Sequence, residues 1–437
     1  MKWRRNILTL MIEVRSGSID EFVKKVAEEE EIEVEKLARL ISEGKVIIPR
    51  NTVRENIKPI GIGMELRTKV NVNVGTSTLY SNLDMEIEKA KIAFKYGTDT
   101  IMDLSTGGNL NEVRKKLIES VPIPFGTVPI YQAFIDSAKR KGAGIHMDED
   151  DVFNTVIKHA KDGVDFMTIH AGITKDLVDD IIRSNRITGV VSRGGAILTA
   201  WMKHNEKENP FYENFDYLLD ICREYDVVIS LGDALRPGSI TDAHDYLQMA
   251  EMLKVSKLVE KAWRRGVQVM VEGPGHMPLN QIAANIKLEK KLCKGAPYYV
   301  LGPLVTDIGA GYDHISSAIG AAIAAAEGAD IICYLTPAEH LSLPDKEDVK
   351  LGLIAAKIAA HAGDIIKLGE KALRRDIEMS KARSSLNWEK MYELSLDPER
   401  SRRMHERFGL KGKVCTMCGE LCVYNLLANL KRMERSR

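Results

Sequence analysis

The feature that most constrains the fold is an alternation of short apolar, β-branched runs with amphipathic helical segments between residues 69 and 337. Such alternation is typical of successive βα units, which build a parallel sheet. There are nine runs: KVNVNVG (69–75), TDTIMDLSTG (98–107), PFGTVPIY (124–131), DFMTIHAG (165–172), GVVSRGG (189–195), VVISLGDALRPG (227–238), VQVMVEGPGH (267–276), YYVLGPL (298–304) and DIICYLTP (330–337).

Nearly every run begins apolar and ends in a polar residue followed by glycine. A doubly wound sheet would gather its ligand at two or three strand ends around one switch point. In a (β/α)₈ barrel all strand ends share one face, and the active site is built there. Because almost all the strand ends carry polar residues, we predict an α/β fold with a (β/α)₈ barrel. One of the nine runs must then be irregular or lie outside it.

The flanking segments are helical in pattern. Ser18 is a candidate N-cap for SIDEFVKKVAEEEE, and Gly44 ends a second helix, VEKLARLISEG. After residue 343 the apolar spacing is that of helices. We therefore predict an N-terminal helical segment (1–65), a catalytic barrel (66–342), a C-terminal helical region (343–400) and a cysteine-bearing tail (401–437).

Charge and cysteine usage exclude several classes of protein. Sixty-two basic residues balance 62 acidic ones, so we expect neither a nucleic-acid partner nor an anionic membrane surface. Glu13 and Arg15 interrupt the first apolar run, and no apolar stretch is long enough to span a membrane. Three cysteines are scattered singly, at Cys222, Cys293 and Cys333, which indicates a reducing compartment. We expect a cytoplasmic protein.

The other three cysteines, Cys415, Cys418 and Cys422, lie within eight residues as C-x2-C-x3-C. A structural zinc site normally needs four protein ligands, and only His405 suggests itself as the fourth. A cubane iron–sulfur cluster held by three cysteines instead leaves one iron open to a substrate or cofactor. The spacing favours the cluster over a zinc knuckle.

Two further patterns suggest ligand sites at the barrel mouth. His276 and His340 each follow a strand run, where imidazole could bind a metal, although single histidines are more often scaffold. SRGG at 192–195 offers an arginine, a hydroxyl and backbone amides before a helix, as in barrel phosphate sites, while DALRPG adds Asp233 and Arg236. An ordinary turn with a surface arginine is equally consistent with SRGG.

Asn73, Met102 and Tyr131 recur 29 residues apart, one in each βα unit. That regularity fits one ligand contacted from several strands, although Met and Tyr are also common core residues.

Together the motifs MDLSTGG, GTVPIYQA, TIHAG, VSRGG, LRPGS, VEGPGH, YYVLGP, DIGAGYDH, CYLTPAEHL, MSKAR and CTMCGELC closely resemble the phosphomethylpyrimidine synthase family, in the expected order from about residue 66 to 424. This resemblance implies a non-standard radical S-adenosylmethionine lyase with a (β/α)₈ barrel and a C-terminal [4Fe-4S] segment. Such an enzyme converts 5-aminoimidazole ribotide to 4-amino-5-hydroxymethyl-2-methylpyrimidine phosphate in thiamine biosynthesis. It releases carbon monoxide and formate, with 5′-deoxyadenosine and methionine from S-adenosylmethionine.

The resemblance also implies roles for individual residues. Cys415, Cys418 and Cys422 would ligate the cluster, His276 and His340 would hold zinc or another divalent metal, and Glu272 and Cys333 would act in catalysis. The implied substrate-binding residues are Asn73, Met102, Tyr131, His170, Ser192, Arg193, Gly194, Asp233, Ala234, Leu235, Arg236, Glu272 and Tyr299. The implied partners are a second copy of the chain and an electron donor such as ferredoxin or flavodoxin.

The sequence departs from the family pattern at two places, and two alternative functions and a second role for Cys333 remain open. Many family members have one more residue between the second and third cysteines, and most have Gly in place of Ala234. A related 5-hydroxybenzimidazole synthase would use the same ribotide, and a metal-binding barrel with a zinc-knuckle tail would be no enzyme at all. Cys333 is either a buried small apolar residue or a thiol that passes a hydrogen atom to or from a carbon radical.

Overall fold

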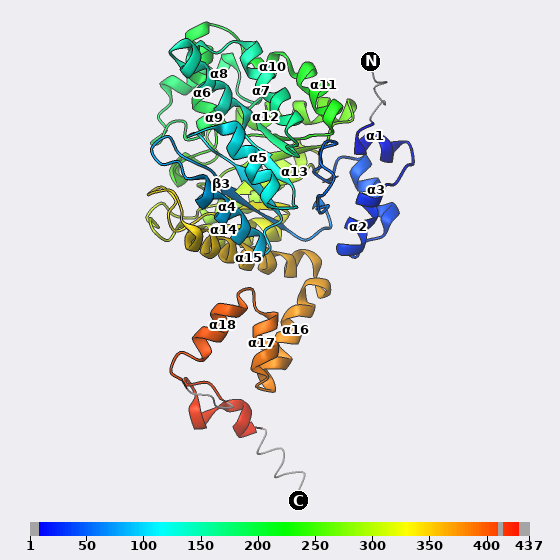
Figure 1. Ribbon diagram of the computed structural model, residues 1–437, viewed down its shortest axis with the longest axis vertical. Helices are drawn as coiled ribbons and strands as arrows, with labels where there is room; N and C mark the ends of the chain where they lie inside the picture. Colours follow the sequence, from blue (N-terminus) through cyan, green and yellow to red (C-terminus); the bar gives the residue numbers. More distant parts are fainter. Residues whose placement is uncertain (1–7, 410–413, 428–437) are drawn as a thin grey trace, which may run out of the picture. The chain divides into compact units, whose positions relative to one another are not determined.

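The computed structural model describes residues 8–409 and 414–427. Its centre is a closed barrel of eight parallel strands, which confirms the predicted (β/α)₈ fold (Figure 1). The barrel strands, in order around the barrel from β3, are β3 (Lys69–Val74), β4 (Thr100–Asp103), β5 (Phe125–Thr127), β6 (Phe166–Ile169), β7 (Val228–Leu231), β8 (Val269–Gly273), β9 (Tyr298–Leu301) and β10 (Ile331–Cys333), which closes on β3.

Helices follow each strand and cover the barrel. They are α4 (Leu83–Lys95), α5 (Leu110–Ser120), α6 (Pro129–Lys141), α7 (Glu149–Lys161), α8 (Lys175–Arg183), α9 (Arg193–Asn205), α10 (Pro210–Glu213), α11 (Phe215–Tyr225), α12 (Tyr246–Arg264), α13 (Ile282–Leu292), α14 (Asp313–Glu327) and α15 (Lys346–Leu368). The apolar residues of the strands and of the inner helix faces form one large buried core. Burial of both strand faces explains why the runs are nearly continuously apolar.

The fifth of the nine runs, GVVSRGG, is the one outside the barrel, so its strand prediction is wrong. Its first residues belong to the segment between α8 and α9, and Ser192 is the N-cap of α9, accepting a hydrogen bond from the Gly195 amide. The pattern of β-branched residues followed by a polar residue and glycine therefore marked a helix start. β6 is followed by four helices before β7.

The N-terminal residues form a small satellite of the barrel. It comprises α1 (Leu10–Arg15), α2 (Glu21–Glu29), α3 (Val34–Ser42) and an antiparallel pair, β1 (Val46–Ile47) and β2 (Ile62–Gly63). Its apolar side chains make a second core that includes Leu37 and Ile41. Asp20, not Ser18 as predicted, caps α2, because the Asp20 carboxylate accepts the Val23 amide at 3.0 Å.

A buried charge network closes the barrel floor, at the N-terminal ends of the strands. Lys69 on β3 is fully buried and pairs with Glu30 at 2.9 Å. Asp364 on α15 accepts the backbone amide and the hydroxyl of Thr68. The floor thus joins the N-terminal satellite, the barrel and α15, while the opposite face is left for ligands.

The chain divides into two compact units, residues 1–367 and 368–437. The second unit contains α16 (Glu370–Ser384), α17 (Trp388–Leu394) and α18 (Pro398–His405), followed by the three clustered cysteines. Over residues 8–409 and 414–427, none of the helices has the length and apolar character that crossing a membrane requires.

Candidate active site

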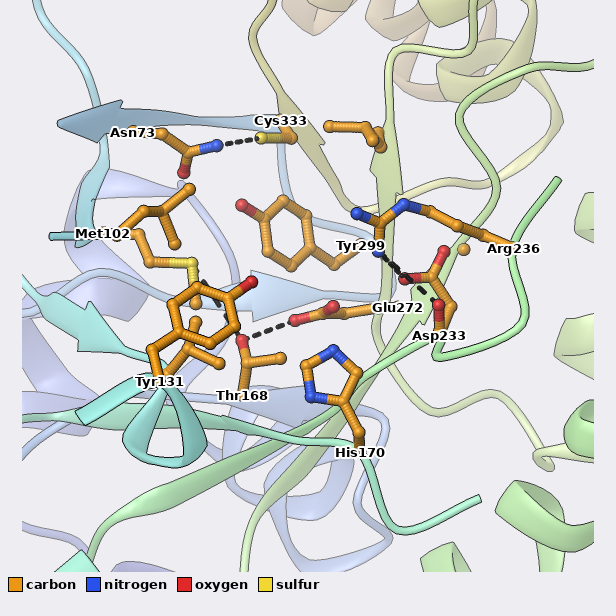
Figure 2. A pocket seen from close by; sticks show the side chains of 14 residues that line it. Asn73, Met102, Tyr131, Thr168, His170, Asp233, Arg236, Glu272, Tyr299 and Cys333 are labelled. Atoms are coloured by element: carbon orange, nitrogen blue, oxygen red, sulfur yellow. Dashed lines mark hydrogen bonds and ion pairs between the residues drawn. The ribbon is translucent and has the colours of Figure 1, made fainter. Parts of the chain in front are cut away.

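A pocket opens at the C-terminal ends of the barrel strands (Figure 2). All eight strands, or the residues just after them, supply its walls, as expected for a barrel active site. Its lining residues are Asn73, Met102, Leu104, Val128, Tyr131, Thr168, His170, Asp233, Arg236, Glu272, Gly273, Tyr299, Leu301 and Cys333.

Most sequence-predicted site residues meet in this pocket. Asn73 and Met102 are register partners on β3 and β4, and Glu272 and Tyr299 are partners on β8 and β9. Cys333 is the last residue of β10. The shared register explains why residues that lie one βα unit apart in sequence line one cavity.

Glu272 is held by two hydroxyl groups from neighbouring strands. Thr168 on β6 and Ser230 on β7 each donate to Glu272 Oε1 at 2.7 Å. Burial raises the pKa of Glu272, and these two hydrogen bonds oppose that rise. Fixing one oxygen in this way leaves the orientation of the carboxyl group defined at the pocket wall.

Asp233 and Arg236 form an ion pair in the turn after β7, at 2.9 Å. Burial raises the pKa of Asp233 to about 7 although Arg236 opposes it, and Asp233 Oδ2 has no hydrogen-bond partner among the described residues. Burial also works against the charge of Arg236, but the neighbouring Asp233 keeps the arginine pKa above its usual value. The pair therefore offers a guanidinium group that stays charged and a carboxyl group that titrates near neutrality.

His170 follows β6 and stays neutral. Burial, with a smaller effect of Arg236, lowers the pKa of His170 to about 3. Its Nδ1 atom is buried without a hydrogen-bond partner in the described structure. A neutral imidazole with an unused nitrogen is suited to a hydrogen bond with a polar ligand.

The SRGG segment reaches the pocket through its neighbours. Arg193 lies over the Tyr131 ring, 4.9 Å from its centroid, and Tyr131 lines the pocket. Gly194 packs on His170 so closely that a Cβ would lie 2.3 Å from the imidazole. The Gly195 amide donates to the Ser192 hydroxyl. Contrary to expectation, it is therefore not free to bind a phosphate.

Ala234 and Leu235 are fully buried and do not line the pocket. Their backbone amides donate to the two oxygens of Glu251 on α12, at 2.8 and 2.7 Å. The structure thus places these two residues behind the pocket, next to the Asp233–Arg236 pair.

Cys333 is a protonated thiol within the pocket. Burial raises its pKa to about 12, and hydrogen bonds with Tyr299 and Asn73 reduce that effect only in part. The Asn73 amide donates to the sulfur at 3.1 Å (Figure 2). The S–H bond is therefore kept intact at neutral pH, facing the same cavity as Glu272 and Tyr299.

The two candidate metal ligands lie near each other, with ring centroids 5.2 Å apart. His276 Nδ1 contacts Asp307 at 2.8 Å, and His340 Nδ1 contacts Asp313 at 3.4 Å. Metal-binding histidines commonly use one nitrogen for a carboxylate in this way and the other for the metal. The pair fits a metal that takes two protein ligands; no set of three or more metal-ligating side chains is gathered anywhere in residues 8–409 and 414–427.

Cys415, Cys418 and Cys422 are free thiols at a turn of the second unit, but the structure, over the described residues 414–427, does not gather them as a set that could hold a metal. The Gly419 amide donates to the Cys415 carbonyl and the Leu421 amide to the Cys418 carbonyl. Hydrogen bonds, chiefly from the Cys418 backbone amide, lower the pKa of Cys415, whereas loss of solvation and the neighbouring Cys415 raise the pKa of Cys418. The thiolate that iron requires is therefore favoured at Cys415. His405, the candidate fourth zinc ligand, instead stacks on Trp388 at 3.8 Å and shares its Nδ1 with the Tyr392 hydroxyl. That arrangement weakens the zinc-knuckle alternative.

Five polar residues that shape this site are not among the predicted site residues: Thr168, Ser230, Glu251, Asp307 and Asp313. Asp307 and Asp313 lie in the motif DIGAGYDH and Thr168 lies in TIHAG, so these three residues had a visible signal in the sequence. Thr168 also lies two residues before His170, and strand side chains alternate in direction. The carboxylates come from helices and loops whose partners are distant in sequence.

A buried polar pocket at the strand ends of a (β/α)₈ barrel defines a barrel enzyme. A model of the radical SAM ThiC family matches residues 9–429. Proteins called phosphomethylpyrimidine synthase are similar over full length: 54% identity with that of Ignicoccus hospitalis over 98% of both chains, and 57% with that of Archaeoglobus fulgidus over 96% of this chain and 98% of the other. The protein of Sulfurisphaera tokodaii is 55% identical over 95% and 97%.

The chain belongs to the radical SAM ThiC family, and it is an enzyme. Membership implies S-adenosylmethionine and an iron–sulfur cluster as cofactors. This agrees with the resemblance drawn from the motifs.

Proposed function

We propose that this enzyme converts 5-aminoimidazole ribotide to 4-amino-5-hydroxymethyl-2-methylpyrimidine phosphate, with loss of carbon monoxide and formate. Two observations support the proposal: the family match spans residues 9–429, and motif residues from the ends of all eight barrel strands line one pocket. The names of the full-length relatives support the same product.

In this proposal Arg193 and Arg236 bind the phosphate of the ribotide. Arg193 is exposed at the start of α9, next to Tyr131, and Arg236 lines the pocket. Arginine binds phosphate through paired, charge-assisted hydrogen bonds. Asp233 keeps the Arg236 guanidinium oriented until the phosphate arrives.

The imidazole part of the ribotide would face Glu272, His170 and Asn73. Neutral His170 supplies a hydrogen bond without adding positive charge beside Arg236. Glu272, with Oε1 fixed by Thr168 and Ser230, can hold or accept a proton at Oε2. Tyr299 and Met102 close the sides of the cavity and limit access of water to the reacting carbons.

Cys415, Cys418 and Cys422 would hold the cluster, which would supply the electron for reductive cleavage of S-adenosylmethionine. Inside the barrel, the intact thiol of Cys333 can pass a hydrogen atom to or from the substrate, and its neighbours Asn73 and Tyr299 hold it in place. A carbon radical reacts with almost any nearby bond, so a rigid, enclosed pocket is required.

His276 and His340 would hold a zinc ion that fixes a polar group of a ligand at the barrel mouth. Their carboxylate partners, Asp307 and Asp313, support this assignment. We further propose a cytoplasmic homodimer that takes its electrons from a ferredoxin or flavodoxin.

The test is anaerobic turnover with 5-aminoimidazole ribotide, S-adenosylmethionine and dithionite, followed by mass spectrometry of the products. We expect the hydroxymethylpyrimidine phosphate together with 5′-deoxyadenosine. Formation of 5-hydroxybenzimidazole would identify the related synthase instead, and a colourless protein without absorbance near 400 nm would reject the iron–sulfur enzyme.

A further inference from the structure

The turn from Asp233 to Arg236 is held by a carboxyl group outside the pocket. Glu251 on α12 is buried, and its two oxygens accept the amides of Ala234 and Leu235 at 2.8 and 2.7 Å. Glu251 does not line the ligand pocket. It lines a neighbouring cavity together with Asp233 and Arg236, and its hydrogen bonds to the site are to the backbone of this turn.

A second residue holds the same turn from the other side. Arg186, in the segment between α8 and α9, donates to the Leu235 carbonyl at 2.7 Å. Its guanidinium is fixed by two hydrogen bonds to Asp245, the N-cap of α12, both 2.6 Å long. The side chain is only 2% exposed, which is rare for an arginine in a loop.

Close packing removes the remaining freedom of the turn. A Cβ on Gly195 would lie 2.3 Å from the Ala234 carbonyl oxygen, and one on Gly172 would lie 2.9 Å from the Glu251 side chain. Helix α9 and the residues after β6 thus press on both the turn and its carboxylate. The hydrogen bonds and the packing together specify one backbone conformation.

We propose that Glu251 and Arg186 are positioning residues, which aim Asp233 and Arg236 into the pocket and so set the affinity for the phosphate-bearing ligand. A site prepared in this way avoids the free-energy cost of ordering the turn when the ligand binds. The identity of the ligand as the ribotide rests on the proposed function, but the action on the turn does not.

The first test needs no ligand. Glu251→Gln keeps the size of the side chain but leaves one of the two amides facing an NH₂ group or without a partner. Hydrogen-exchange mass spectrometry of a peptide spanning residues 231–237 should show faster exchange of the Ala234 and Leu235 amides in this variant. Unchanged exchange would overturn the proposal.

The matched control is Glu289→Gln on the neighbouring helix α13. Glu289 is equally buried, and neither of its oxygens has a hydrogen-bond partner among the described residues. It does not line the pocket or contact the turn. Exchange in peptide 231–237 should match the wild-type protein in this control.

The second test measures ribotide binding by titration calorimetry and, separately, reductive cleavage of S-adenosylmethionine without ribotide. Glu251→Gln should weaken ribotide binding roughly tenfold, as expected for one unsatisfied buried amide, and leave cofactor cleavage unchanged. Arg186→Lys keeps the charge but cannot bridge Leu235 and Asp245 in the same way, so it should weaken ribotide binding as well.

The outcomes separate the two proposals. Wild-type protein that does not bind the ribotide would reject the proposed function, while the exchange result would still decide the role of Glu251. Normal ribotide affinity in Glu251→Gln, or an equal loss in Glu289→Gln, would overturn the positioning role.

Discussion

The Cys333 thiol is the residue whose role can be tested most directly. It is 3% exposed and protonated, and it faces the pocket. Cys333→Ser nearly preserves size but replaces a weak S–H bond with a strong O–H bond. We expect the variant to load its cluster and bind both ligands, yet form at least tenfold less pyrimidine product, measured by mass spectrometry.

Cys222→Ser is the control for this substitution. Cys222 on α11 is 1% exposed, and burial raises its pKa to about 12 as well, but it does not line the pocket. Turnover in the control should be near wild type. If Cys333→Ser and Cys333→Ala also turn over normally, the thiol only fills space.

A second residue-scale prediction concerns the hydroxyl groups on Glu272. Because hydrogen bonds from Thr168 and Ser230 lower the Glu272 pKa, removing one should raise it. In Thr168→Val and in Ser230→Ala, the part of the pH–activity profile that depends on ionisation of Glu272 should move to higher pH, by up to about one pH unit. The measurement is the pH profile of turnover.

Thr168→Ser keeps the hydroxyl and should keep the wild-type profile. A profile unchanged in both Thr168→Val and Ser230→Ala would show that the ionisation of Glu272 does not limit the reaction.

At this scale the sequence revealed the pocket residues through strand-end motifs and a known family, but not the residues that hold them. The Thr168–Glu272 bond joins residues 104 positions apart, and Glu251 lies on a helix with no distinctive motif. Such partners are defined by barrel closure, which places strands and helices side by side regardless of their separation in sequence.

Among the elements, helix α13 carries an unusual buried acid. Burial raises the pKa of Glu289 to about 8, from an ordinary value of 4.5. The native state therefore binds more protons than the unfolded chain between these pH values, so stability falls as pH rises through that window. Glu289→Gln removes this loss, which is on the order of a few kcal/mol.

The expected result is a melting temperature that is similar for both proteins at pH 5 and increasingly higher for Glu289→Gln from pH 6 to 9. Scanning fluorimetry across this range measures it. Parallel curves for the two proteins would show that Glu289 does not titrate in the folded protein.

Eight of the nine expected strands are present because their apolar runs are buried on both faces, and this signal is strong. The fifth run, GVVSRGG, does not form a strand because GVV before Ser192 resembles a strand end, yet its residues lead into a helix cap. The cap of α2 was misplaced by two residues because Ser18 and Asp20 are both good caps, and the choice depends on where the helix packs.

For the whole molecule, the division into two units predicts how the cysteines behave. Every member of the two buried apolar cores precedes residue 361. The three cysteines proposed as cluster ligands lie outside these cores. Replacing Cys415, Cys418 or Cys422 with Ala should abolish iron content, absorbance near 400 nm and S-adenosylmethionine cleavage. Circular dichroism and the melting temperature of the barrel should stay near wild type.

Ribotide binding, measured by calorimetry, distinguishes loss of the cluster from loss of the barrel fold, because it depends on the barrel pocket. Retained iron or retained cofactor cleavage in any single variant would show that the cysteine is not a ligand.

The same division determines what exposure to air does to the enzyme. Cys418 is exposed, and the unit that carries it is separate from the buried cores. Oxidation would remove iron and sulfide from the smaller unit and leave the larger unit folded. We expect this damage to be reversible, because iron and sulfide could reload the smaller unit without synthesis of a new chain. Until that repair, the damaged molecule would still sequester its substrate, so inactivation would also lower the free substrate pool.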